Sequence, residues 1–126
     1  MATLSSHLLN SVNGTHASGV KVIINQINSS GEKVIFFESE TDNGGRILKD
    51  FDLSTNDCNC DYEMVCKTAD YFSEKKIVSE IIIKFRMEDP KKKYHLPIII
   101  SPNGYSIWWS QSVSYTHLTL PTICSV

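Results

Sequence analysis

The strongest constraint on the fold is an alternating run from Lys93 to Ser101 that ends in a turn. In an extended chain successive side chains point to opposite faces. One face of this run is apolar and carries Tyr94, Leu96, Ile98 and Ile100. The other face carries Lys93, His95, Pro97 and Ile99. Ser-Pro-Asn-Gly at 101–104 is typical of a tight turn, so the pattern predicts a β-hairpin with a histidine outside the core.

Similar strand-like patterns recur along the chain and predict eight short strands. They lie at residues 4–10, 20–27, 33–40, 46–48, 61–67, 80–88, 93–100 and 105–109. The one predicted helix covers 68–76, with Thr68 as its N-cap, and residues 50–59 are expected to form a polar loop. Strands without alternating helices argue against a parallel α/β sheet. The sequence therefore predicts an all-β, antiparallel, eight-stranded β-sandwich with one short helix.

Length, charge and cysteine usage bound the function. The 126 residues predict one domain with its own core, and the net charge of −2 gives no reason to expect nucleic acid or a membrane as a partner. No secretory signal and no membrane-length apolar run is recognisable, so a soluble, cytoplasmic protein is expected. The four cysteines lack the paired spacing of a zinc site, so no metal is predicted and the thiols are expected to be reduced.

Three polar residues stand out by their positions: His7, Arg46 and His95. Strand alternation places His7 opposite the apolar face, and Arg46 directly follows a Gly-Gly turn. Taken singly, each is better explained as a surface or hydrogen-bonded side chain than as a catalytic residue. His16 is expected to be an exposed turn residue without a role, and His117 is given none. The chain has no signature of a Ser-His-Asp triad or of a phosphate-binding loop.

Three separated motifs resemble the transthyretin superfamily and, within it, the 5-hydroxyisourate hydrolases. Residues 4–10, Leu-Ser-Ser-His-Leu-Leu-Asn, resemble Leu-Ser-x-His-Val-Leu-Asp of the hydrolases. Residues 41–46, Thr-Asp-Asn-Gly-Gly-Arg, are similar to Thr-Asn-x-Asp-Gly-Arg. Residues 94–106 are close to Tyr-His-Val-Pro-Leu-Leu-Leu-Ser-Pro-x-Gly-Tyr-Ser. The motifs occur in the same order and at the same separations as in the family, over about residues 4 to 109. The resemblance is therefore specific.

The resemblance implies a transthyretin-like (prealbumin) fold and hydrolysis of 5-hydroxyisourate to 2-oxo-4-hydroxy-4-carboxy-5-ureidoimidazoline in urate degradation. It implies no cofactor and no metal. It also implies a homotetramer, a dimer of dimers, whose active sites lie in the central channel. His7, Arg46 and His95 are then the catalytic residues, with His95 as the general base. His7 and Arg46 also bind substrate, Arg46 through its permanently charged planar fork.

The same residues separate the two branches of the superfamily. Thyroid-hormone carriers have lost the two histidines and the arginine, whereas all three are present here within their motifs. This favours the enzyme. The alternative is a non-catalytic transthyretin-like tetramer that binds a small ligand, and the end of the domain supports it.

The hydrolases typically end in Tyr-Arg-Gly-Ser, and the aligned residues here are Trp108 to Gln111. Trp108 is predicted to bind substrate in place of the tyrosine, as an aromatic wall without the hydroxyl. Residues 1–111 are assigned to the domain. Residues 112–126 form an atypical C-terminal tail that looks like translated sequencing-adapter sequence and is interpreted as an artefact. Family members also occur in peroxisomes, which is the alternative location.

Overall fold

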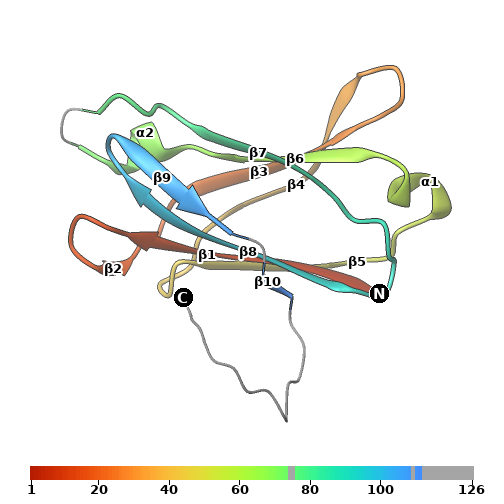
Figure 1. The fold of residues 1–126 in the computed structure, drawn as a ribbon, viewed down its shortest axis with the longest axis horizontal. Coiled ribbons are helices and arrows are strands. Elements are labelled where there is room, and N and C mark those ends of the chain that lie inside the picture. The colour runs from red at the N-terminus through yellow and green to blue at the C-terminus, as the bar shows by residue number, and fades with distance from the viewer. Residues whose placement is uncertain (74–75, 109, 112–126) are drawn as a thin grey trace, which may run out of the picture.

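The protein is described by a computed structural model that covers residues 1–73, 76–108 and 110–111. Two β-sheets face each other across one core, and two single-turn helices lie at the connections (Figure 1). The strands are β1 (Ala2–Asn10), β2 (Thr15–His16), β3 (Lys21–Ile27), β4 (Lys33–Glu40), β5 (Arg46–Phe51), β6 (Asp61–Cys66), β7 (Ile81–Arg86), β8 (Lys93–Ser101), β9 (Gly104–Ile107) and β10 (Ser110–Gln111). The helices are α1 (Thr55–Cys58) and α2 (Thr68–Tyr71). The predicted all-β sandwich is confirmed.

Strand β1 is the centre of the first sheet. It pairs with β5 and β2 along one edge and with β8 along the other, and β8 in turn pairs with β9 and β10. The second sheet has the order β4-β3-β6-β7. The β1–β8 pair is parallel, whereas the other pairs are antiparallel. The purely antiparallel expectation is wrong at this pair, because the chain passes through the second sheet between β1 and β8 and no hairpin fixes their direction.

The core forms where the inner faces of the two sheets meet. Along β1 buried and half-buried residues alternate, as period two requires. The most deeply buried large side chains come from both sheets and include Leu4, Leu8, Ile24, Tyr62, Met64, Ile98 and Ile100. The predicted inward row of β8 is confirmed, and His95 lies half-buried on the outer face. The core therefore holds β1 and β8 rigidly, and their outer side chains are displayed from a fixed support.

The helices differ from the prediction. Helix α2 is a single turn that ends at Tyr71, because the next residue, Phe72, has an extended backbone and a buried side chain. Thr68 is not its N-cap: Lys67 holds that position without a side-chain hydrogen bond, and Thr68 is buried with its hydroxyl unpartnered among the described residues. The expected loop at 50–59 contains the end of β5 and helix α1, which Ser54 opens with a capping box.

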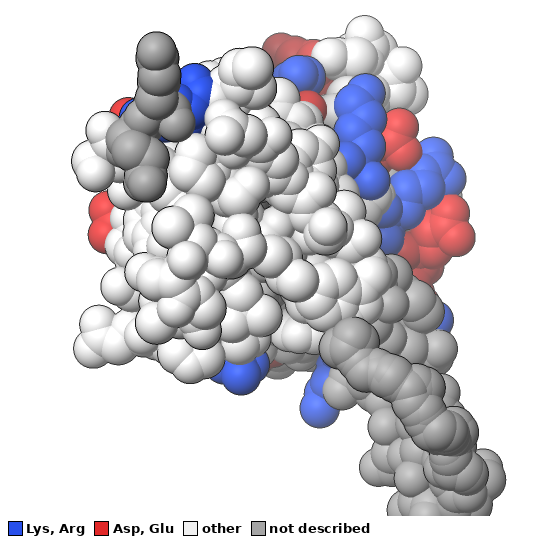
Figure 2. All heavy atoms as spheres, turned by 60° about the vertical axis from the view of Figure 1, so that its left-hand side comes forward, with Lys and Arg blue, Asp and Glu red and all other residues white. Residues whose placement is uncertain are grey.

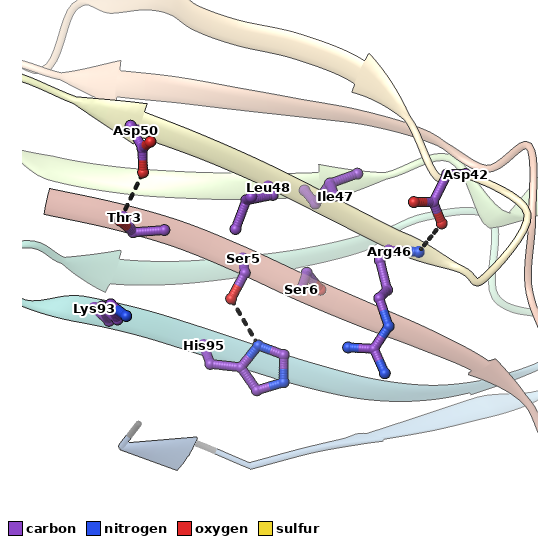
Figure 3. A pocket seen from close by; sticks show the side chains of 10 residues that line it. All are labelled: Thr3, Ser5, Ser6, Asp42, Arg46, Ile47, Leu48, Asp50, Lys93 and His95. Atoms are coloured by element: carbon purple, nitrogen blue, oxygen red, sulfur yellow. Dashed lines mark hydrogen bonds between the residues drawn. The ribbon is translucent and has the colours of Figure 1, made fainter. Parts of the chain in front are cut away.

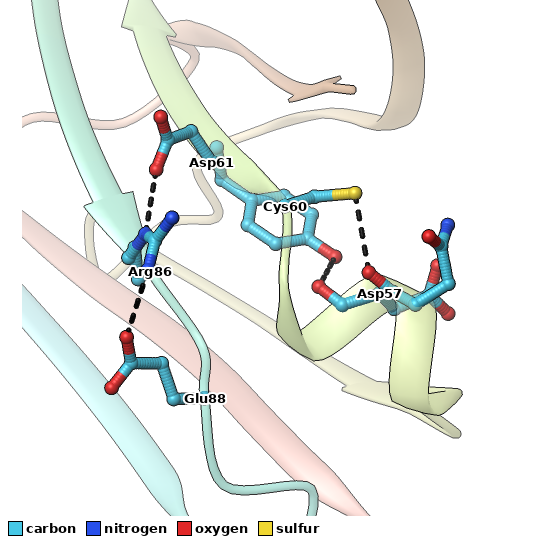
Figure 4. A network of polar contacts seen from close by, with 7 residues as sticks. Asp57, Cys60, Asp61, Arg86 and Glu88 are labelled. Carbon is cyan, nitrogen blue, oxygen red and sulfur yellow. Dashed lines mark hydrogen bonds and ion pairs between the residues drawn. The ribbon is translucent and has the colours of Figure 1, made fainter. Parts of the chain in front are cut away.

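A network of polar contacts attaches α1 to the second sheet (Figure 4). The Tyr62 hydroxyl donates to the Asp57 carbonyl at 2.8 Å, and burial raises the pKa of that hydroxyl to about 12. Beside it, Arg86 binds the carboxylates of Asp61 at 2.7 Å and Glu88 at 3.0 Å. These exposed ion pairs link β6 to β7 and to the loop that follows, and each contributes little stability alone.

Charged side chains of both signs lie together at the periphery of the face drawn in Figure 2, and uncharged residues occupy most of its middle. The formal net charge is −2. Within the described ranges, no helix is both long enough and apolar enough to cross a membrane.

Candidate active site

The register of the first sheet gathers three distant residues on its outer face. His7 on β1 pairs with Arg46 on β5, and Ser5 on β1 pairs with His95 on β8. Residues directly opposite each other across a sheet point to the same side. The three predicted site residues, His7, Arg46 and His95, therefore project from neighbouring strands on the side away from the core.

An open hollow of about 790 Å³ lies over these strands. Arg46 and His95 line it, with Ser5 between them; Asp42 lies at one end and Lys93 at the other (Figure 3). The Arg46 side chain extends from β5 across β1 and ends beside the His95 ring. Its charge acts on both His7 and His95. The hollow thus joins a cation and an imidazole in one solvent-accessible site, whose lining also includes the apolar residues Ile47 and Leu48.

His95 is fixed by its neighbour on β1. Its Nδ1 lies 2.8 Å from the Ser5 hydroxyl oxygen, and the residue is half-buried. Burial, and then the Arg46 charge, lower the pKa of His95 below 6.5, while a hydrogen bond to the Ser5 backbone opposes this shift. The imidazole is therefore predominantly neutral at pH 7.

His7 is held in a similar way by a residue that the sequence analysis left without a role. Its Nε2 lies 2.9 Å from Nδ1 of His16, which is exposed as expected but is not unpartnered. Burial, Arg46 and His16, in that order, lower the pKa of His7, and a hydrogen bond to the Gly44 backbone opposes them. The dipeptide Asn13-Gly14 in the sequence indicates a turn. The register that sets His16 beside β1 could not be predicted from it.

The guanidinium of Arg46 remains available for a ligand. Within the described part of the chain, no hydrogen bond or ion pair engages its side chain, which is exposed. Its backbone N–H donates to Asp42 Oδ1 at 2.9 Å, which is the first cause of the lowered pKa of that carboxyl group. The preceding turn is attached to β1, because Leu8 N–H donates to the Gly45 carbonyl at 2.7 Å.

Trp108 is half-buried directly after β9. Its N–H meets the Pro97 carbonyl at 3.5 Å, which continues the β8–β9 register that pairs Ile98 with Ile107. That register puts Trp108 on the same side of the sheet as His95, although it is not among the residues that line the hollow. Trp109 and residues 112–126 lie outside the described residues. The backbone of Ser110 pairs with that of His95.

Metal-binding and thiol chemistry have little support in the described ranges. No group of three or more His, Cys, Asp or Glu residues there is placed to hold a metal ion. Cys58, Cys60 and Cys66 are free thiols. Burial raises the pKa of Cys66 to about 12, which keeps it protonated and unreactive.

The chain is similar in sequence to bacterial proteins that are named 5-hydroxyisourate hydrolase. It is 28% identical over 112 residues to the 5-hydroxyisourate hydrolase of Halalkalibacterium halodurans, with 83% of this chain and 94% of that protein covered. It is 32% identical over 108 residues to the 5-hydroxyisourate hydrolase of Salmonella typhimurium, with 83% and 78% covered.

Solved structures give the same relationship. The 5-hydroxyisourate hydrolase of Klebsiella pneumoniae matches with a TM-score of 0.69 and 27% identity over 86% of this chain and 99% of its own. Transthyretin from Sparus aurata shares the fold, with a TM-score of 0.75 and 20% identity over 87% and 97%. The sequence profile of the HIUase/Transthyretin family matches residues 4–109. The chain therefore belongs to the HIUase/Transthyretin family.

Proposed function

We propose that this protein hydrolyses 5-hydroxyisourate to 2-oxo-4-hydroxy-4-carboxy-5-ureidoimidazoline, a ring-opening step of urate degradation. The relatives that bear the name 5-hydroxyisourate hydrolase support the substrate. The observation that carries the proposal is the placement of His7, Arg46 and His95 on one outer face, where Arg46 acts on both imidazoles. No cofactor enters the proposed reaction.

His95 serves as the general base. Nδ1 of His95 faces the Ser5 hydroxyl at 2.8 Å. In the proposed mechanism this nitrogen carries the proton and donates it to the hydroxyl oxygen, and Nε2 presents its lone pair to the hollow. A neutral imidazole can then take a proton from the attacking water.

Arg46 stabilises the negative charge that develops in the transition state. In the reaction a bond forms between the water oxygen and a ring amide carbonyl, whose oxygen becomes negative. The ring C–N bond then breaks, the nitrogen leaves with the proton that His95 took from the water, and the new carboxyl group loses its proton to solvent and remains as a carboxylate. A permanently charged guanidinium beside that oxygen stabilises the transition state more than the substrate. His7 orients water or substrate, and Trp108 supplies an apolar wall at the position of the family tyrosine.

We further propose a homotetramer, a dimer of dimers. The hollow is open on the outer face of a sheet, and Leu48 on its lining is 67% exposed. A second copy placed over this face would bury Leu48 and exclude bulk water from the site. In the proposed assembly the site would lie in a channel between subunits.

A second candidate is a non-catalytic tetramer that binds a small ligand in the same channel. Trp108 in place of the family tyrosine favours it, because the indole offers ring surface and no hydroxyl. The retained basic triad of His7, Arg46 and His95 favours the enzyme.

An absorbance assay of freshly generated 5-hydroxyisourate tests the proposal. The full chain and a version that ends at residue 111 are compared, since residues 112–126 are proposed to lie outside the domain. Accelerated decay with both chains supports the hydrolase. Acceleration with the shorter chain alone supports the hydrolase and assigns an inhibitory effect to the tail, whereas no acceleration with either chain supports the binding protein.

A further inference from the structure

We infer that His16 is a positioning residue for His7: its Nδ1–H donates a hydrogen bond to Nε2 of His7 and so fixes the orientation and the tautomer of that ring. The inference rests on the proposed hydrolase function, in which His7 orients water or substrate. It concerns a residue that lies outside the three motifs and on a strand of only two residues, β2.

The two rings are in direct contact. Nε2 of His7 lies 2.9 Å from Nδ1 of His16, and the ring centroids are 5.0 Å apart with planes inclined by 31°. A distance of 2.9 Å between ring nitrogens is that of a hydrogen bond, which requires one nitrogen to carry the proton and the other to present a lone pair.

The backbone of His16 is fixed from two directions. It pairs with Leu9 in the β1–β2 ladder, and the next residue, Ala17, donates its N–H to the Leu8 carbonyl at 2.9 Å. The turn before β5 lies close to this residue, since a Cβ atom added at Gly45 would lie 3.2 Å from Cβ of His16. His16 is thus an exposed side chain on a constrained backbone, which suits a residue that holds another in place.

The surroundings of His7 favour one direction for this hydrogen bond. The Gly44 backbone acts to raise the pKa of His7, which is the effect of a carbonyl oxygen near an imidazole. Nε2 faces His16, so in the inferred arrangement Nδ1 of neutral His7 carries the proton and Nε2 presents the lone pair. His16 must then supply the proton from Nδ1, which leaves its own Nε2 to solvent.

The other charged groups near His7 do not replace this contact. Arg46 on β5 and His95 on β8 lower the pKa of His7, and Asp42 lies in the turn that precedes β5. His16 on β2 lowers it as well. Of these groups, His16 is the one whose ring is hydrogen bonded to the His7 ring, so its loss should change the tautomer as well as the titration of His7.

Three variants separate the hydrogen bond from the hairpin that carries it. His16→Ala removes the donor. His16→Asn retains a side-chain N–H close to the place of Nδ1 without an ionisable ring. Thr15→Ala, the control, changes the same short strand through its hydroxyl contact with Asn13 Oδ1, 2.7 Å long, and leaves both rings intact. Tautomer and titration of His7 are read by NMR of ¹⁵N-labelled imidazole, and kcat is measured with 5-hydroxyisourate across pH.

For His16→Ala we expect a rise in the His7 pKa, a mixed tautomer and a fall in kcat of about tenfold or more. His16→Asn should restore the Nδ1–H tautomer and most of kcat, and Thr15→Ala should match the original protein. An unchanged His7 tautomer and titration in His16→Ala would overturn the inference, as would equal losses in His16→Asn and His16→Ala. If the original protein does not turn over 5-hydroxyisourate, the proposed function fails, and the NMR titration still decides the role of His16.

Discussion

At the scale of single residues, burial and then the charge of Arg46 lower the pKa of both imidazoles in the site. The Arg46 guanidinium has no ion-pair partner among the described residues and disfavours protonation of both His7 and His95. Both imidazoles have a lowered pKa, so both are neutral in the folded protein over a wider pH range than a free histidine. Activity that needs neutral imidazole should therefore persist below pH 6.5 and fall as the pH drops through the lowered values.

Arg46→Gln should raise the pKa of His95 and of His7, because a nearby positive charge no longer opposes their protonation. NMR titration of the two rings measures this shift. Lys49→Gln is the matched control: it removes one cation from the same strand, but the Lys49 ammonium lies over the Phe37 ring at 5.6 Å. Equal shifts in the two variants, or none in Arg46→Gln, would contradict the assignment.

Ser5→Ala should lower kcat by about tenfold through loss of the contact at 2.8 Å that orients His95. Ser5→Thr, which keeps a hydroxyl and suits a strand, should retain most of the activity. Steady-state kinetics at pH 7.5 distinguishes the two. An unchanged kcat in Ser5→Ala would contradict a role for this hydroxyl in orienting His95.

The three motif residues could be predicted from the sequence, since alternation placed His7 and His95 outside the core and each lay in a specific motif. His16 could not, because its partner is set by the register of a hairpin and not by spacing along the chain. The role of Ser5 was equally hidden, since a serine on a strand carries no distinctive pattern. The part assigned to Trp108 stays a prediction.

At the scale of elements, the turn before β5 joins the site to the sheet. Gly45 has a φ of 73°, and a Cβ there would lie 2.5 Å from the Leu8 carbonyl oxygen. Gly14 has the same φ of 73°, but nothing lies within 4 Å of the corresponding position. A larger residue would therefore meet the same unfavourable backbone conformation at both positions, but it would clash with neighbouring atoms only at position 45.

Gly45→Ala should destabilise the protein more than Gly14→Ala. The left-handed conformation costs an alanine about 1–2 kcal/mol, and only position 45 adds displacement of β1 next to His7. Urea unfolding measures the free energy of unfolding of each variant. Equal losses would mean that the turn can move away from β1 without cost.

Strands were predictable because period two separates the core face from the outer face, as in β1 and β8. The helices were not, because each is one turn set by local contacts: Ser54 and Asp57 cap α1, and α2 stops where Phe72 enters the core. The parallel direction of β1 and β8 depends on the path of the chain between them, which no local pattern records.

At the scale of the whole molecule, assembly should complete the site. Light scattering after size exclusion is expected to give about four times the 14.2 kDa mass of the chain. Leu48→Glu should lower that mass, since a carboxylate placed on a buried subunit contact would lose its hydration. Ile35→Glu, at a residue 64% exposed on β4 of the other sheet, is the matched control and should leave the mass unchanged. A monomer in the original protein would contradict the proposed tetramer.

The most direct test of the central claim is the initial rate of 5-hydroxyisourate decay with the original chain and with His95→Ala, both verified by light scattering to have the same mass. General-base catalysis contributes about 10²–10⁴-fold, so the variant should lose at least about a hundredfold of the catalysed rate. A His95→Ala chain that turns over substrate as fast as the original would contradict the account.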